Sequence, residues 1–314
     1  MRTVQPEGIQ ALANTRLSAG AWKVKPFSRE RPVQRRRQAI RCSQDPQRVS
    51  AASQQHLQTF PVDYPTALRQ AQAATLAALG DGHQLIEVEF PTSSLQGVSG
   101  DAEGANEMTY SMGFLRQFCR SFQQNAAATR IFFPDKKEME VARTGKGIEE
   151  EGGAVFDVTK FQLDYLTTPS GFLDIGIDYG KTDITTRTCE TDELYIIAYP
   201  HFNVNEIIAV DELYQRVAKA AGSPIVVFNG ELDRIRSGYY PPFVYPKLGK
   251  LARSFIPHFE SAYYIHNFKG SRGGVLFRAY PDPWQVLSRR GDSLTLVHTQ
   301  DTMPVLKDVA LNIL

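Results

Sequence analysis

Hydrophobic residues follow two different periods, which alternate from about residue 60 to the C-terminus. At 84–90 the apolar residues Ile86, Val88 and Phe90 occupy every second position, which predicts a strand. At 106–122 they recur every three or four positions, which predicts a helix. The same criteria predict helices at 65–79, 106–122, 204–221 and 246–256, a last helix from Pro304 with Val305, Val309 and Ile313 on one face, and strands at 84–90, 131–133, 161–166, 193–199, 225–228, 262–265, 274–280 and 294–298.

The order of these elements predicts the fold class. Strands separated by helices pair in parallel through right-handed crossovers. The strand at 225–228 is apolar throughout, which indicates a central position covered on both faces. No helical pattern separates 274–280 from 294–298, so these strands are expected to form an antiparallel edge. We therefore predict a single α/β domain over 60–314, with a mostly parallel, doubly wound open sheet and an antiparallel edge. Within it, Gly and charged residues at 144–153 predict a flexible loop.

The first 50 residues differ from the rest in charge. They contain eleven Lys and Arg against three Asp and Glu, so they carry +8, which leaves −7 for the remainder of a chain of net charge +1. An acidic body argues against nucleic-acid binding by that body. Many Ser, Ala and Gln, few acids and no periodicity favour a disordered organellar transit peptide over a nucleic-acid arm, with processing expected near Cys42.

Several classes of chemistry lack their usual motif. The three cysteines form no CxxC pair, which argues against a disulfide framework or a zinc knuckle, and Cys119 is expected to be a core thiol. No run approaches the roughly 18 apolar residues of a spanning helix, so any membrane contact would be peripheral or through a partner. We find no GxGxxG, Walker A, GxSxG or HExxH motif, and we expect no cofactor and no metal.

Polar loops follow four of the predicted strands. In open α/β sheets, ligand sites gather beyond the carboxyl ends of the strands, so these loops are expected to converge on one binding rim. The alternative is that these loops are polar only because they are exposed to solvent. The candidate rim residues are Asp101, Glu103, Asn203, Asn205, Asn229, Glu231, Asp233, Arg234, Arg236, Tyr239, Tyr240, His266, Asn267 and Lys269.

Within that rim, three subsets have a chemical interpretation and a simpler alternative. The four carboxylates Asp101, Glu103, Glu231 and Asp233 could bind a metal, although spacing alone does not show it and helix capping or salt bridging is the simpler explanation. His266 is the best placed general base, but without a nucleophile it is more simply a structural histidine. The run 233–242 mixes Arg, Tyr and Pro, which is typical of interface centres; an internal Arg–carboxylate clamp is the alternative.

Five stretches, 86–92, 199–206, 228–241, 264–270 and 283–287, resemble a chloroplast family that carries the domain of unknown function DUF1995. The resemblance covers roughly 61–314. It implies a chloroplast transit peptide and a non-enzymatic factor of the stroma or the thylakoid surface that assists photosystem II assembly. Such a factor would bind newly made core antenna subunits or membrane assembly and insertion partners. The family implies no catalytic residues. The competing hypothesis is a small-ligand or nucleotide-binding α/β enzyme that uses the loops at the strand ends.

Overall fold

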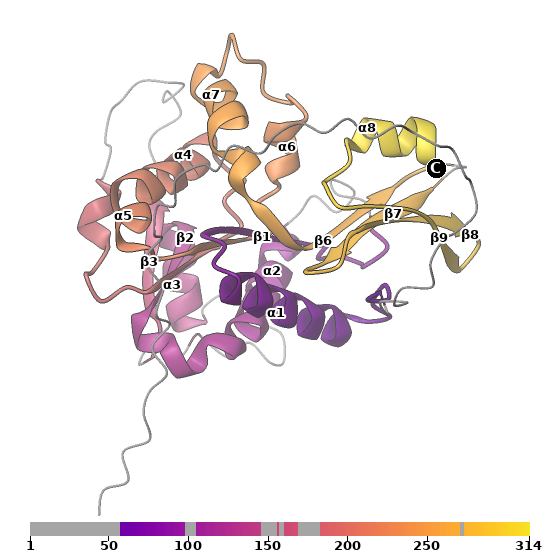
Figure 1. The fold of residues 1–314 in the computed structure, drawn as a ribbon. Helices are drawn as coiled ribbons and strands as arrows, with labels where there is room; N and C mark the ends of the chain where they lie inside the picture. Colours follow the sequence, from indigo (N-terminus) through magenta and orange to yellow (C-terminus); the bar gives the residue numbers. More distant parts are fainter. Residues whose placement is uncertain (1–56, 98–104, 146–155, 157–159, 169–182, 271–272) are drawn as a thin grey trace, which may run out of the picture. The chain divides into compact units, whose positions relative to one another are not determined.

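The computed structural model describes residues 57–97, 105–145, 156, 160–168, 183–270 and 273–314. For residues 105–109 it describes the backbone only. One sheet runs through these residues in the order β3-β2-β4-β5-β1-β6-β7-β8-β9 (Figure 1). Its strands are β1 (Leu85–Glu89), β2 (Thr129–Asp135), β3 (Gln162–Thr167), β4 (Leu194–Ala198), β5 (Ile225–Phe228), β6 (Glu260–Phe268), β7 (Gly274–Ala279), β8 (Trp284–Arg290) and β9 (Ser293–Gln300).

Pairing is parallel from β3 to β6 and antiparallel from β6 to β9. The helices are α1 (Tyr64–Gly80), α2 (Ala105–Cys119), α3 (Lys136–Thr144), α4 (Val204–Leu213), α5 (Lys219–Ala221), α6 (Leu232–Arg236), α7 (Pro246–Ser254) and α8 (Leu306–Asp308). A π-helical turn, Tyr214–Ala218, makes α4 and α5 one continuous helix, and another, Val309–Ile313, extends α8. Three 3₁₀ segments are Arg120–Ala128, Ile184–Arg187 and Ile256–His258.

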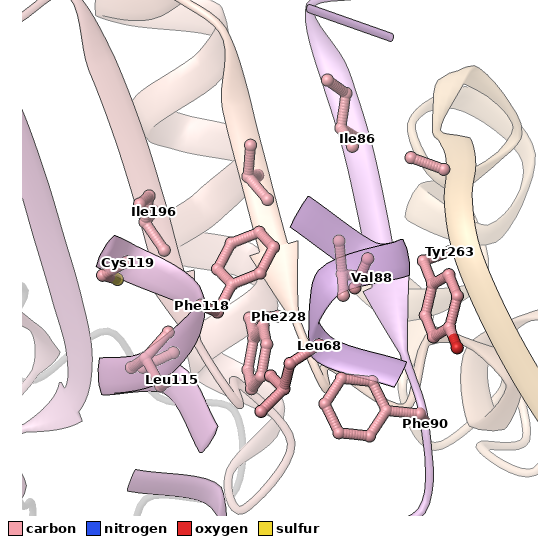
Figure 2. Packing of buried hydrophobic residues seen from close by; sticks show 14 of the residues in the cluster. Leu68, Ile86, Val88, Phe90, Leu115, Phe118, Cys119, Ile196, Phe228 and Tyr263 are labelled. Carbon is pink, nitrogen blue, oxygen red and sulfur yellow. The ribbon is translucent and has the colours of Figure 1, made fainter. Parts of the chain in front are cut away.

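Alternation along β1 distributes its side chains between two core layers. Ile86 and Val88 pack with residues of α1, α2 and α3, as Figure 2 shows for the first two helices. Leu85, on the opposite face, packs with residues of α4, α6 and α7. The C-terminal helix covers a third, smaller cluster over β6, β7 and β8. Helices therefore cover both faces, as a doubly wound sheet requires.

The predicted fold class is confirmed. β5 is fully buried and central, and Cys119 lies inside the first core layer, where burial raises the pKa of its thiol (Figure 2). Among the described helices, none has the length and apolar character needed to cross a membrane.

The antiparallel edge differs from the prediction in one strand. β8 lies between β7 and β9, which therefore do not pair with each other. The sequence hides this strand because Trp284, Gln285, Val286 and Leu287 are all buried, so apolar and polar positions do not alternate. The last helix is also shorter than predicted: Val309 is buried, whereas Val305 precedes the helix and is 69% exposed.

Two short helices have no counterpart in the prediction. α3 and α6 are nine and five residues long, too short to produce a clear helical period. The predicted loop at 144–153 overlaps the end of α3 at Thr144, where Gly145 adopts the left-handed conformation of a C-cap. Its remaining residues, and the predicted transit peptide at 1–50, lie outside the described residues.

Candidate functional site

The carboxyl ends of β4, β5, β1 and β6 lie at one edge of the sheet, because these four strands are adjacent and parallel. The chain after β4 and β5 enters helices on one face, α4 and α6, whereas the chain after β1 enters α2 on the other. The boundary between β5 and β1 is therefore a topological switch point, where open α/β sheets form their binding crevices.

The backbone at this edge is strained. Tyr199, Asn229 and Glu231 have φ values of 33°, 49° and 46°, in the left-handed region that residues other than glycine rarely occupy. Asn229 also links the end of β5 to the end of β1. Its backbone N–H donates to the Val88 carbonyl (2.7 Å), and its Oδ1 accepts from the Phe90 N–H (3.1 Å). Such strain persists only where the surroundings impose it, and it is concentrated at functional sites.

Arg236 is the centre of a buried ion-pair network. Its guanidinium donates to both carboxylate oxygens of Glu87, at 2.8 and 2.7 Å, and to Asp233 at 3.0 Å. Ser261 donates to the same Glu87 (2.6 Å), and the Tyr264 hydroxyl donates to Asp233. Glu87 is fully buried, so Arg236 supplies the charge that its carboxylate needs. For this arginine, the internal clamp is the interpretation that the contacts support.

A second cluster surrounds His201, which follows β4. Its Nδ1 lies 3.3 Å from Glu231 Oε1, yet within the described ranges neither ring nitrogen has an aligned hydrogen-bond partner. Burial, with the nearby Arg234 guanidinium, lowers the pKa of His201 to about 3, so the ring is neutral at physiological pH. Arg234 in turn forms an ion pair with Glu231 across one helical turn.

His201 lines a small pocket between the end of β4 and α6. Its volume of about 20 Å³ holds roughly one water molecule. The other lining residues are Pro200, Asn203, Val204, Ile207, Gly230, Glu231, Arg234, Ile235, Tyr240 and Leu248. A pocket of this size suits a water or the tip of a side chain better than a whole nucleotide.

Glu89 and His266 lie on the same face of β1 and β6. Burial, followed by the carboxylates Glu231 and Glu87, raises the pKa of Glu89 well above its ordinary value. Burial lowers the pKa of His266, partly offset by Asp233, whose carboxylate is 3.8 Å from the ring. Burial therefore favours the neutral form of both side chains. In the part of the chain that the structure describes, no three or more His, Cys, Asp or Glu side chains are arranged to bind a metal.

The remaining candidates have different positions. Asn203 is the exposed N-cap of α4 and accepts from the Asn205 N–H (2.9 Å). Asn267 points to the opposite face from His266 and donates to the Leu95 and Gly97 carbonyls, so it anchors the chain after β1. Lys269 is exposed beyond β6.

Tyr239 is 70% exposed, and its ring packs edge-on against the half-buried Tyr240. Asp101 and Glu103 lie outside the described residues, so the structure brings together only part of the predicted rim.

Three important residues were missed: Glu87, Glu89 and His201. A signal for the first two was present, because alternation at 84–90 puts both glutamates on one face of an inner strand. Charged residues there require a buried partner. His201 had no comparable signal, since its burial depends on how α6 covers the end of β4.

The family model for a domain of unknown function, DUF1995, matches residues 61–311. Neither a curated protein nor a solved structure matches the chain.

Proposed function

Because the chain belongs to the family defined by DUF1995, we propose that it is a non-enzymatic auxiliary factor of photosystem II assembly, similar to the chloroplast protein low photosystem II accumulation 3. It acts in the stroma or at the thylakoid surface. It binds newly made core antenna subunits or membrane assembly partners.

One observation carries this proposal: the two arginines of the rim are held by carboxylates, whereas two aromatic rings beside them face solvent. Arg234 and Arg236 are held by Glu231, Glu87 and Asp233. We define the rim surface as Phe202, Asn203, Tyr239 and Tyr240. Phe202 and Tyr239 are 50% and 70% exposed, and each is next in sequence to a residue lining the His201 pocket. Exposed aromatic residues around a small pocket are typical anchors for a protein partner.

Affinity capture from intact chloroplasts tests the proposal. The double variant Phe202→Ala/Tyr239→Ala should lose its bound client, because alanine removes both exposed rings. The control, Val62→Ala/Val305→Ala, truncates two side chains that are 89% and 69% exposed elsewhere and should retain the client. Blocking translation should deplete the wild-type capture if the client is a newborn subunit. Equal capture by both double variants would refute the rim surface as the binding site.

The chloroplast location has its own test. Residues 1–50 are proposed to be a transit peptide because they are basic and poor in acids. Isolated chloroplasts should import the full chain and shorten it, with a new N-terminus near Cys42. A chain that remains full length outside the organelle would contradict the location without bearing on the rim surface.

A small-ligand or enzymatic function at the strand ends is the second candidate. It is favoured by the His201 ring, which has no aligned hydrogen-bond partner among the described residues, and by the three left-handed residues around it. Thermal shift with nucleotides, divalent cations and tetrapyrroles would test it, comparing the wild type with His201→Ala. A shift in the wild type alone would support the candidate, and no shift with any of these compounds would count against it.

A further inference from the structure

The connection between α6 and α7 carries exposed apolar side chains immediately before a basic helix. Figure 1 shows this connection extending beyond both helices at the top of the view. Phe243 and Val244 are 88% and 47% exposed. Exposing a phenylalanine almost completely to water is unfavourable, and here a second exposed apolar side chain lies next to it in the sequence, so the pair forms a small apolar tip.

The loop is held in a fixed position. The Val244 and Tyr245 N–H groups both donate to the Pro241 carbonyl, at 3.0 and 2.9 Å. Pro242 packs so closely on α7 that a Cβ at Gly249 would lie 2.9 Å from the proline Cβ. Phe243 is therefore presented by a preformed turn.

Helix α7 presents a single charge sign beside this turn. Lys247, Lys250 and Arg253 recur at helical spacing and are exposed, whereas Leu248 and Leu251 are buried on the opposite side. The sequence contains no Asp or Glu between Asp233 and Glu260. The body as a whole is acidic, at −7 beyond residue 50, so this local excess of cations is not a general property of its surface.

We propose that Phe243, Val244, Lys247, Lys250 and Arg253, together termed the basic lobe, form a docking site for an anionic lipid surface. The cations would contact lipid headgroups, and Phe243 and Val244 would enter the interfacial layer. A lipid surface fits both parts of the basic lobe, because its headgroups are anionic and its interfacial layer accepts apolar side chains. The proposal adds membrane attachment to the proposed function, and it shares no residue with the rim surface.

A local probe is needed, because the basic residues 1–50 of the full chain would themselves bind anionic vesicles. The variant Phe243→Trp places such a probe at the tip, and subtracting the wild-type spectrum removes Trp22 and the buried Trp284. With phosphatidylglycerol–phosphatidylcholine vesicles, its emission should shift to shorter wavelength and be quenched by bromine-labelled lipid. Pure phosphatidylcholine should give neither effect.

Lys247→Gln/Lys250→Gln/Arg253→Gln in the Phe243→Trp background should weaken this insertion on the order of 100-fold at low salt, since three cations are lost. Lys136→Gln/Lys137→Gln, at exposed positions of α3, is the matched control and should leave it unchanged. The proposal is overturned if the introduced indole remains in water on anionic vesicles, or if it inserts equally after the triple substitution. It is equally overturned if a shift occurs only with membranes that retain their proteins, which would identify a protein partner.

Discussion

Arg236 and Glu87 form a two-pronged ion pair, with N–O distances of 2.8 and 2.7 Å, between α6 and the central strand β1. They are 149 positions apart in the sequence. The pair connects the Arg- and Tyr-rich run to the interior of the sheet, so part of the run supports the fold and part is exposed for binding.

Removing this arginine should destabilise the protein severely. Arg236→Ala would leave the Glu87 carboxylate buried without its charge partner, and we expect a loss of about 3–5 kcal/mol in the free energy of unfolding. Urea denaturation measures the difference. Arg216→Ala is the matched control, because Arg216 also forms a two-pronged pair, with Asp183, but at an exposed position where solvent screens the charges. Comparable losses of unfolding free energy in the two variants would show that the Glu87 carboxylate is not buried as the structure indicates.

Glu206 should make the protein less stable as the pH rises. Burial raises the pKa of its carboxyl from 4.5 to about 8, despite the hydrogen bonds it accepts from the Phe202 and Asn203 N–H groups at the start of α4. The folded state therefore holds a proton that the unfolded state releases. Its stabilising effect is complete below pH 4.5 and is lost as the pH rises to about 8, by up to about 1.4 kcal/mol per pH unit.

Glu206→Gln keeps an acceptor for these N–H groups and removes the titration. Plotted against pH, the unfolding free energies of this variant and the wild type should separate steadily between pH 5 and 8. Parallel curves over that interval would contradict the buried, protonated carboxyl.

His201 should make the protein less stable as the pH falls, the opposite of the effect of Glu206. Its pKa falls from 6.5 to about 3 on folding, so between these values the unfolded state binds the additional proton. The associated stability is present above pH 6.5 and is lost as the pH falls toward 3. His201→Gln should therefore resist acid unfolding better than the wild type, with a lower midpoint pH by circular dichroism. His298→Gln, at an exposed position on β9, should leave the midpoint unchanged. An unaltered midpoint in His201→Gln would show that the ring is accessible to water.

Gly274 should not tolerate a methyl group. At this position, at the start of β7, a Cβ would overlap the Leu287 carbonyl oxygen of β8 and the Leu314 side chain. Gly274→Ala should therefore destabilise the antiparallel edge and the C-terminal helix, seen as a lower melting temperature. Gly113→Ala, inside α2 with open space around its Cβ position, should instead stabilise by up to about 1 kcal/mol. A higher melting temperature for Gly274→Ala would show that a methyl group fits at this position, and a lower one for Gly113→Ala would show that the space around its Cβ is not open.

The periodicity of apolar residues along the chain was sufficient to predict most of the strands and helices. The alternation in β1, the continuous apolar run of β5 and the helical periods of α1 and α4 are each regular, and that regularity is visible in the sequence. Where burial is two-sided and includes a polar residue, as with Gln285 in β8, the period disappears. Where a helix has only five residues, as α6 does, no period can develop.

The site was predictable only as a location. Parallel strands put their carboxyl ends at one edge, so the order of elements alone indicates where polar loops gather. Which of those loops face one another depends on pairings between distant segments. Asn229 and Asn267 illustrate the difference: both follow or end a strand, yet one ties β5 to β1 and the other anchors a loop on the far face.

The sequence by itself determined the α/β class, the mostly parallel pairing with an antiparallel edge, and the end of the strands at which polar loops gather, because these follow from periodicity and chain connectivity. Only the tertiary structure decided that Arg236 is buried against Glu87 while Tyr239 and Phe243 face solvent. The reason is physical: the exposure and charge state of a side chain depend on what distant parts of the chain pack against it.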